Sequence, residues 1–155
     1  MTDMNTTITN VLTVLNTGSY LTDPYNGTRV GSFAFGPDYE MTFGKYMPKI
    51  HVTDGDYSTD RYTFGKSRRL KHPTINIYFY TKDGDKDFNT NYKNRQLVYD
   101  YLDKIEDAIS NNMTLIPNVK SPQFGNVGRV IYVQEQKIYW GVKPVTFTFI
   151  KEPTS

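Results

Sequence analysis

The sequence contains no cysteine and only two histidines, His51 and His72, which lie far apart along the chain. Without cysteine there is no disulfide, no thiol nucleophile and no cysteine-ligated zinc site. Two isolated histidines do not have the clustered spacing of a histidine-rich metal site, and each is more typical of a structural role. We therefore expect no metal and no cofactor.

The sequence also lacks a strong net charge and a long hydrophobic run. Its 18 Lys and Arg against 16 Asp and Glu leave a net charge of +2, too little to indicate a nucleic-acid binder by itself. The most apolar stretch, Ile75–Tyr80, is too short to span a bilayer and already includes Asn76. The N-terminus, MTDMNTTITN, has no basic region before an apolar stretch, so we expect neither a signal peptide nor a membrane partner.

Aromatic residues are what the sequence has in excess. They make up 15% of 155 residues, with 13 Tyr and 9 Phe, whereas disordered chains are poor in aromatics. The length fits one domain, residues 1–155. Tyrosine and phenylalanine favour strands and also surfaces that contact other proteins.

Two segments have apolar residues at helical spacing. In Thr7–Leu15 the apolar positions recur three to four residues apart, which predicts a short helix ending before Gly18. In Lys93–Asn111 seven apolar residues form one face while acidic residues occupy most of the other, which predicts the best helix of the chain.

The remaining regular segments have the texture of strands. We expect a short strand at Lys49–Thr53 followed by a turn at Asp54–Asp56, and the clearest strand at Thr74–Thr81. Further strands are expected at Val127–Gln136 and at Ile138–Ile150, the latter broken at Gly141 or Pro144. The order of elements predicts an α+β fold, with an antiparallel or mixed sheet of about four strands and helices packed on one face.

Residues 19–46 form a long Gly-, Pro- and aromatic-rich stretch outside these elements. Residues 29–35 and 39–43 alternate weakly around Gly36, which indicates a hairpin or extended arm; an ordinary surface loop with its own aromatic cluster is the alternative. Its aromatic side chains are candidate contacts with a partner: Tyr20, Tyr25, Phe33, Phe35, Tyr39 and Phe43.

The densest charged segment is basic and spans residues 61–71. It combines five cations with two aromatic rings, the residue types that bind phosphates and stack on bases. The alternatives are a solvated loop, or a loop that pairs with the acidic helix face of a neighbouring copy. The candidate contacts are Arg61, Lys66, Arg68, Arg69 and Lys71 on one side and Asp103, Glu106 and Asp107 on the other.

No segment has the pattern of a catalytic or metal site. Asp83, Asp85 and Asp87 alternate as in a calcium loop, but Phe88 and Asn94 stand where that loop needs Gly and Glu. A Gly-rich phosphate loop and a nucleophile elbow are also missing. We therefore expect a protein that is not an enzyme and has no catalytic residue.

The layout of the chain resembles the tail terminator proteins of long-tailed bacteriophages and related archaeal viruses. The resemblance lies in the succession of Pro48–Val52, Arg69, Pro73–Phe79, the helix Arg95–Ile109 and two closing strands. It covers about residues 7–150 without the aromatic arm, and it rests on element order and texture, with no diagnostic motif.

This resemblance implies a structural virion protein made in the host cytoplasm. Members of that family form rings, typically hexamers, that cap the tail tube and join the tail to the neck. The implied partners are copies of the chain itself, the tail tube and the neck or stopper proteins, with contact to packaged DNA as a further possibility. Another neck or tail-completion protein, or a nucleic-acid-binding module that uses residues 61–71, remains the alternative.

Overall fold

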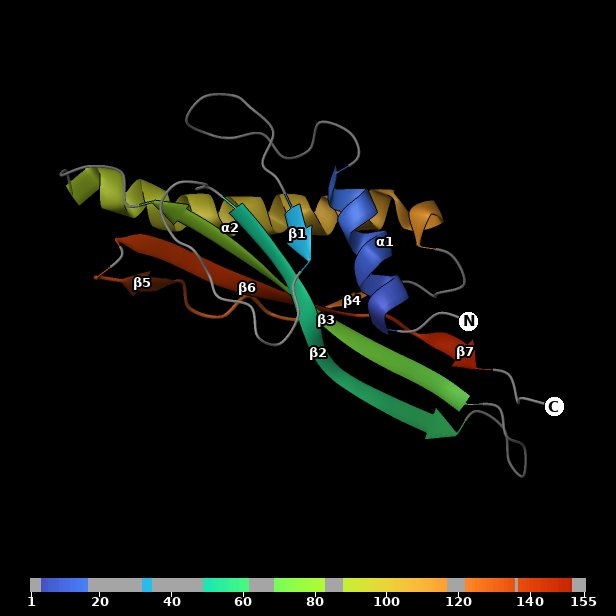
Figure 1. Cartoon of the computed structure of the whole chain (residues 1–155). Coiled ribbons are helices and arrows are strands. Elements are labelled where there is room, and N and C mark those ends of the chain that lie inside the picture. The colour runs from blue at the N-terminus through green and yellow to red at the C-terminus, as the bar shows by residue number, and fades with distance from the viewer. Residues whose placement is uncertain are drawn as a thin grey trace.

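A single twisted sheet forms the centre of the molecule (Figure 1). The computed structural model describes residues 4–16, 32–34, 49–61, 69–82, 88–116, 122–135 and 137–151. Along the main path the strand order is β1-β2-β3-β6-β4, while β5 pairs with β6 and β7 pairs with β3. The strands are β1 (Ser32–Ala34), β2 (Lys49–Arg61), β3 (Arg69–Lys82), β4 (Gln123–Phe124), β5 (Ile131–Val133), β6 (Ile138–Thr146) and β7 (Phe149–Lys151).

Strands β2 and β3 form a long antiparallel pair that runs from Lys49 opposite Tyr80 to Arg61 opposite Arg69. The turn expected at Asp54–Asp56 is therefore wrong, because β2 continues through it. The register shifts by one residue between Asp54 and Tyr57, which is a β-bulge. A bulge tolerates the Asp and Gly residues that normally indicate a turn, because its extra residue lies outside the ladder.

The closing strands also differ from the sequence prediction. Strand β6 passes through both Gly141 and Pro144, and the interruption before β7 falls at residues 147–148. The strand expected at Val127–Gln136 is reduced to β5, three residues that pair with the start of β6. Outside β5, Val127 and Val130 pack against the core without joining the ladder, which is why the sequence there looked like part of a strand.

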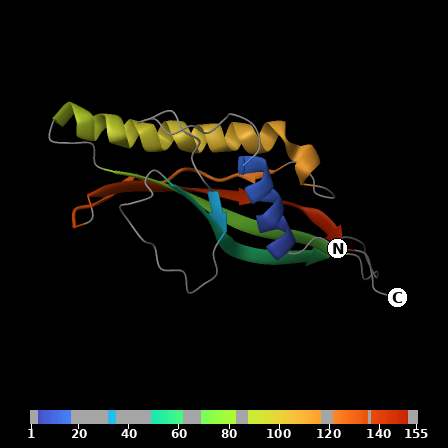
Figure 2. The same cartoon turned by 45° about the horizontal axis from the view of Figure 1, so that its top comes forward.

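Helices α1 (Met4–Asn16) and α2 (Phe88–Asn111) pack on the same face of the sheet, as Figure 2 shows. A 3-10 turn at Met113–Leu115 follows α2. Both helices are those predicted from the apolar spacing, and each begins earlier than expected. The α+β prediction, with helices on one face of a mixed sheet, is confirmed.

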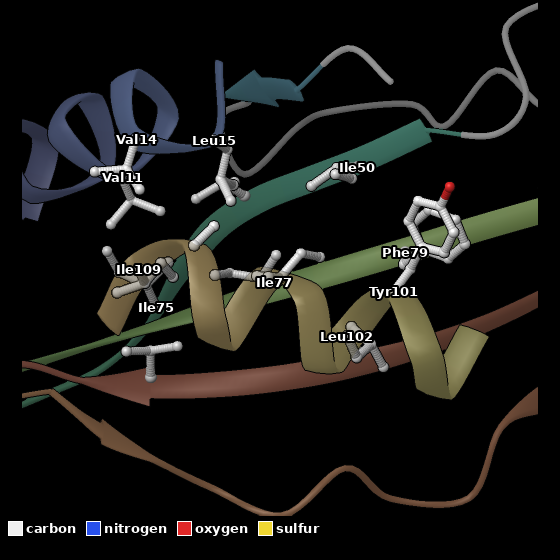
Figure 3. Close-up of a cluster of buried hydrophobic side chains, with 14 of the residues drawn as sticks. Val11, Val14, Leu15, Ile50, Ile75, Ile77, Phe79, Tyr101, Leu102 and Ile109 are labelled. Carbon is white, nitrogen blue, oxygen red and sulfur yellow. The ribbon is translucent and has the colours of Figure 1, made fainter. Parts of the chain in front are cut away.

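The core lies between these helices and the sheet, and strand alternation determines which residues enter it (Figure 3). In β3, Ile75, Ile77 and Phe79 are fully buried on the helix side. The Phe79 ring stacks on Tyr101 of α2, with ring centroids 4.7 Å apart. Each such buried side chain contributes about 1.5–3 kcal/mol, so this layer holds α2 on the sheet.

Strand β1 lies in the region predicted as an arm, but it pairs differently from the expected hairpin. Its three residues run parallel to β2, with Phe33 opposite His51. The other expected half of the hairpin, residues 39–43, lies outside the described residues, so the arm itself remains a prediction.

Gly141 lies where α2 comes closest to β6. A Cβ atom at this position would lie 2.9 Å from Val98 and 3.0 Å from Leu102, both on α2. By contrast, Gly128 is exposed and has no atom within 4 Å of its Cβ position. The absence of a side chain at Gly141 therefore sets the spacing between helix and sheet.

We predict that Gly141→Val lowers the free energy of unfolding by about 1–3 kcal/mol, because the added atoms overpack this contact. Gly128→Val, the matched control, is expected to change it by less than about 0.5 kcal/mol. Urea unfolding of both variants measures the difference. Equal stability of the two variants would contradict this account of the packing.

Candidate interaction surfaces

Strands β2, β3 and β7 extend beyond both helices (Figures 1 and 2). Tyr57, opposite the buried Pro73, is 42% exposed, which shows where the helix cover ends. Lys71 lies two residues further along β3, with its Nζ 5.7 Å from the centre of the Tyr57 ring. This end of the sheet therefore offers a solvent-accessible surface with an aromatic ring and a cation.

The strand register brings further cations together at this end. Arg61 of β2 pairs with Arg69 of β3, and Arg69 pairs on its other side with Lys151 of β7. By backbone register, three basic residues thus stand opposite one another on three adjacent strands. We call Arg61, Arg69, Lys71 and Lys151 the cationic sheet end.

Helix α2 carries charges of the opposite sign. Asp100, Asp103 and Asp107 are all exposed, and their spacing of three and four residues places them along one line of the helix. That line is opposite the buried face formed by Val98, Leu102, Ile105 and Ile109. We call the three aspartates the acidic ridge. It points away from the sheet.

Glu106 is on the same helix but differs from the ridge. Its carboxylate is 3.3 Å from Nζ of Lys143, a buried lysine on the helix side of β6. The Lys143 ammonium also lies 5.8 Å from the centre of the Phe124 ring. Because Lys143 is removed from water, Glu106 supplies a neutralising charge inside the subunit, a role that its sequence position among exposed acids did not reveal.

The sheet face opposite the helices carries a cluster of rings. Tyr78 and Tyr80 stack with centroids 6.1 Å apart, and Trp140 lies 5.7 Å from Tyr78 and 6.2 Å from Tyr80. His51 meets Tyr80 edge-on at 5.7 Å. Register explains the cluster, since Tyr80 pairs with Trp140, and Tyr78 pairs with both His51 and Val142.

Part of this ring cluster and its aliphatic surroundings remains accessible. Tyr78, Trp140 and Val142 are only partly buried, and Ile131, opposite Trp140, is 43% exposed. We call these four residues the aromatic patch. Among the described residues, both helices lie on the other face. His51 and Tyr80 of the same face are fully buried, whereas the four residues of the patch are not, and partly exposed apolar side chains that lie together are typical of a surface that another protein covers.

The structure places the predicted contact residues in different parts of the subunit, with Glu106 on the inner side of the helix as described. Arg61, Arg69 and Lys71 lie on the neighbouring strands β2 and β3 at the cationic sheet end, and Asp103 and Asp107 belong to the acidic ridge. Phe33 lies in β1. The others lie outside the described residues: Tyr20, Tyr25, Phe35, Tyr39, Phe43, Lys66 and Arg68.

Sequence reasoning missed Lys151 and the aromatic patch as contact surfaces. Tyr78 and Trp140 lie in segments that are rich in apolar residues, so their composition does not single them out as exposed. Alternation contained the signal: Tyr78 is out of phase with Ile75, Ile77 and Phe79. Lys151 has no such signal, because its place beside Arg69 depends on the pairing of β7 with β3.

Two comparisons with known proteins assign no family and no function to this chain. No family model matches the chain, and a search of curated proteins also finds no match. Within the described residues, no group of His, Cys, Asp or Glu has the arrangement of a metal site. None of the helices described is both long and apolar enough to cross a membrane.

We predict that Glu106→Gln costs about 1–2 kcal/mol of unfolding free energy, because it leaves the Lys143 charge buried without its counter-charge. The value is below that of a fully buried pair because the Glu106 side chain is 35% exposed. Asp103→Asn removes a charge from the exposed ridge and is the control, with an expected change under about 0.5 kcal/mol. Combining Glu106→Gln with Lys143→Met should recover part of the loss in chemical denaturation; no recovery would argue against this pairing.

Proposed function

We propose that this protein is a structural subunit that assembles into a ring at the head–tail junction of a virus. In this role it caps the tail tube and joins the tail to the neck. It works by binding other proteins through its surfaces and performs no catalysis.

The observation that carries the proposal is the aromatic patch. Aromatic side chains are enriched in protein–protein interfaces, where rigid rings give a large contact area. Here Tyr78 and Trp140 are partly exposed beside Val142 and Ile131 on the sheet face away from both helices. Such a surface is expected on a subunit whose function is to assemble with other proteins.

Two charged surfaces on different parts of the subunit also support a ring. The cationic sheet end and the acidic ridge are opposite in sign and differ in structure, one in the sheet layer and one on the outer side of α2. Contacts between unlike surfaces are heterologous, and such contacts form closed rings when the rotation between subunits closes.

The assignment to a head–tail junction rests on the resemblance in layout to tail terminator proteins. A strand at Lys49, the long strand through Pro73–Phe79, the helix through Arg95–Ile109 and the closing strands all occur in that order. The ring size expected from the resemblance is six.

We predict that the purified protein forms a ring of several copies, and that assembly shields Trp140, the single tryptophan of the chain. Native mass spectrometry over a dilution series gives the number of copies. Tryptophan emission and acrylamide quenching, with and without tail tubes, report the burial of the patch. Emission is expected to shift to shorter wavelength as rings form or as rings meet tubes.

Ile131→Lys tests the patch directly, because it adds a charge at a position that is 43% exposed in the subunit. We expect it to weaken assembly or tube binding by about tenfold or more. Leu115→Lys is the matched control, since Leu115 is also an exposed hydrophobic residue but lies outside the patch. A protein that stays monomeric at high concentration and with tail tubes, and whose deletion leaves tails normal, would refute the proposal.

A nucleic-acid-binding module is the second candidate, and the row formed by Arg61, Arg69 and Lys151 favours it. Phosphate contacts predict an affinity for DNA that falls steeply between about 50 and 200 mM salt. Replacing Arg68 and Arg69 should abolish such binding. Fluorescence anisotropy with a labelled duplex measures both effects, and weak binding that is insensitive to salt would eliminate this candidate.

A further inference from the structure

We propose that strand β7 of one copy adds to the outer edge of β2 in the next copy, so that the sheets of neighbouring copies join into one. The pairing is parallel and places Ile150 of one copy opposite Asp60 of the other. This inference rests on the proposed ring and names the backbone contact that repeats around it.

The hydrogen bonds of β3 determine which backbone groups of β2 point outward. The carbonyl of Pro73 accepts a hydrogen bond from the Phe147 amide over 3.0 Å, so the main chain of Pro73 faces the side on which β6 and β7 lie. Tyr57, which stands opposite Pro73, therefore has its peptide groups turned away from β3. Because peptide groups alternate along a strand, the N–H and C=O of Thr59 and Arg61 point the same way.

The same alternation assigns the outer edge of β7. By register, Phe149 and Lys151 stand opposite β3 residues that share the phase of Pro73, so their peptide groups face β3. The N–H and C=O of Ile150 therefore point to the other side. Among the described strands, none pairs with β7 on that side, and β2 has β1 as its outer neighbour only at Ile50–Val52.

The end of β2 is accessible in the subunit. Asp56 and Ser58 are exposed, and Tyr57 between them is 42% exposed. Successive side chains of a strand point to opposite faces, so at Tyr57 and Ser58 both faces of β2 reach solvent. This pattern is typical of an edge strand, which can accept another strand through its backbone.

Strand β1 shows that this edge accepts a short parallel strand. Its three residues run along Ile50–Val52. The β-bulge that follows separates this stretch from the end of β2, where regular pairing with β3 continues to the last residue. Strand β7 also has three residues, so it matches the second stretch as β1 matches the first. With Ile150 opposite Asp60, the Ile150 N–H donates to the carbonyl of Thr59. The Ile150 carbonyl accepts from the amide of Arg61.

Strand directions also fit a ring. Both β2 and β7 are antiparallel to β3, so they run in the same direction on opposite sides of it. A rotation about an axis along the strands preserves this direction, so β7 of one copy meets β2 of the next in parallel. The two edges differ, which makes the contact heterologous, and such contacts close into rings when the rotation fits. The contact lies at the end of the sheet that extends beyond both helices (Figures 1 and 2).

Engineered cysteines test the register, because the chain has none of its own. Asp60 and Ile150 pair with Leu70 from its two sides, so within one subunit they are about 9–10 Å apart, too far for a disulfide. We expect a mixture of Asp60→Cys and Ile150→Cys copies to form a covalent dimer on mild oxidation, at least fivefold more than either variant alone. The double variant should give a ladder of bands up to the full ring on a non-reducing gel.

Asp54→Cys mixed with Ile150→Cys is the matched control for chance collisions. Asp54 is exposed on the same strand but lies before the bulge, about 20 Å along β2 from Asp60. This mixture should give no more dimer than the single variants.

A backbone variant and hydrogen exchange test the bonds themselves. Ile150→Pro removes the amide that donates to the neighbour, and Ile150→Val, the control, retains it. We expect the proline variant to raise the dissociation constant of the ring by about tenfold or more. The thermal unfolding temperature of the subunit should change little, because this amide does not bond to β3. In the unmodified protein the Ile150 amide should exchange at least tenfold more slowly in the ring than in the dilute subunit.

Each result supports or overturns the contact. The specific cross-link between positions 60 and 150, with slower exchange of the Ile150 amide in the ring, would establish it. Rings without that cross-link would overturn this inference and leave the proposed ring in place. Equal cross-linking of Asp60→Cys with itself, or an Ile150 amide already protected in the dilute subunit, would also overturn it. If the unmodified protein is monomeric alone and with tail tubes, the proposed function fails and the inference with it.

Discussion

The structure depends on one strand, β3. The alternation of its side chains separates the two faces of the sheet, and its length determines how far the sheet extends beyond the helices. Strand β3 pairs with β2 on one side and with β6 and β7 on the other, so it joins the β1–β2 part of the sheet to the part formed by β4, β5 and β6. One set of its side chains, including Ile77 and Phe79, holds the helices. The other set, including Tyr78, forms the opposite face. Its 14 residues span about 46 Å, while the 24 residues of α2 span about 36 Å.

That difference in length gives the subunit its surfaces. The helices cover only part of the sheet, and the uncovered end gathers basic residues from three strands that are distant in sequence. On the opposite face, Tyr78 and Trp140 pack side by side and stay partly accessible. Stability comes from the covered part of the sheet, and the proposed function uses what remains exposed.

The sequence alone predicted the elements that have strong periodicity. Both helices and the strand through Ile75–Tyr80 were expected, because apolar spacing and β-branched residues leave few alternatives there. The extension of β2 through Asp54–Tyr57 was missed, because Asp and Gly residues at a bulge look the same as in a turn. Strand β6 passes Gly141 for a tertiary reason, since α2 fills the space that a side chain would occupy.

The residue types of the candidate contacts were predictable from the sequence, but their arrangement in space was not. The basic character of residues 61–71 and the acidic face of α2 are visible in the sequence, whereas the alignment of Arg61, Arg69 and Lys151 requires the register of three strands. In the sequence, Glu106 looks like one more residue of the exposed acidic face. In the structure its carboxylate contacts the buried Lys143, so it neutralises a charge inside the subunit.

We propose that copies of this chain form a ring that caps a tail tube. Electron microscopy of the purified protein mixed with tail tubes tests it most directly. We expect rings in the protein alone and a ring at the end of the tubes in the mixture. Fields that contain only single subunits and uncapped tubes, at concentrations well above those in an infected cell, would contradict it.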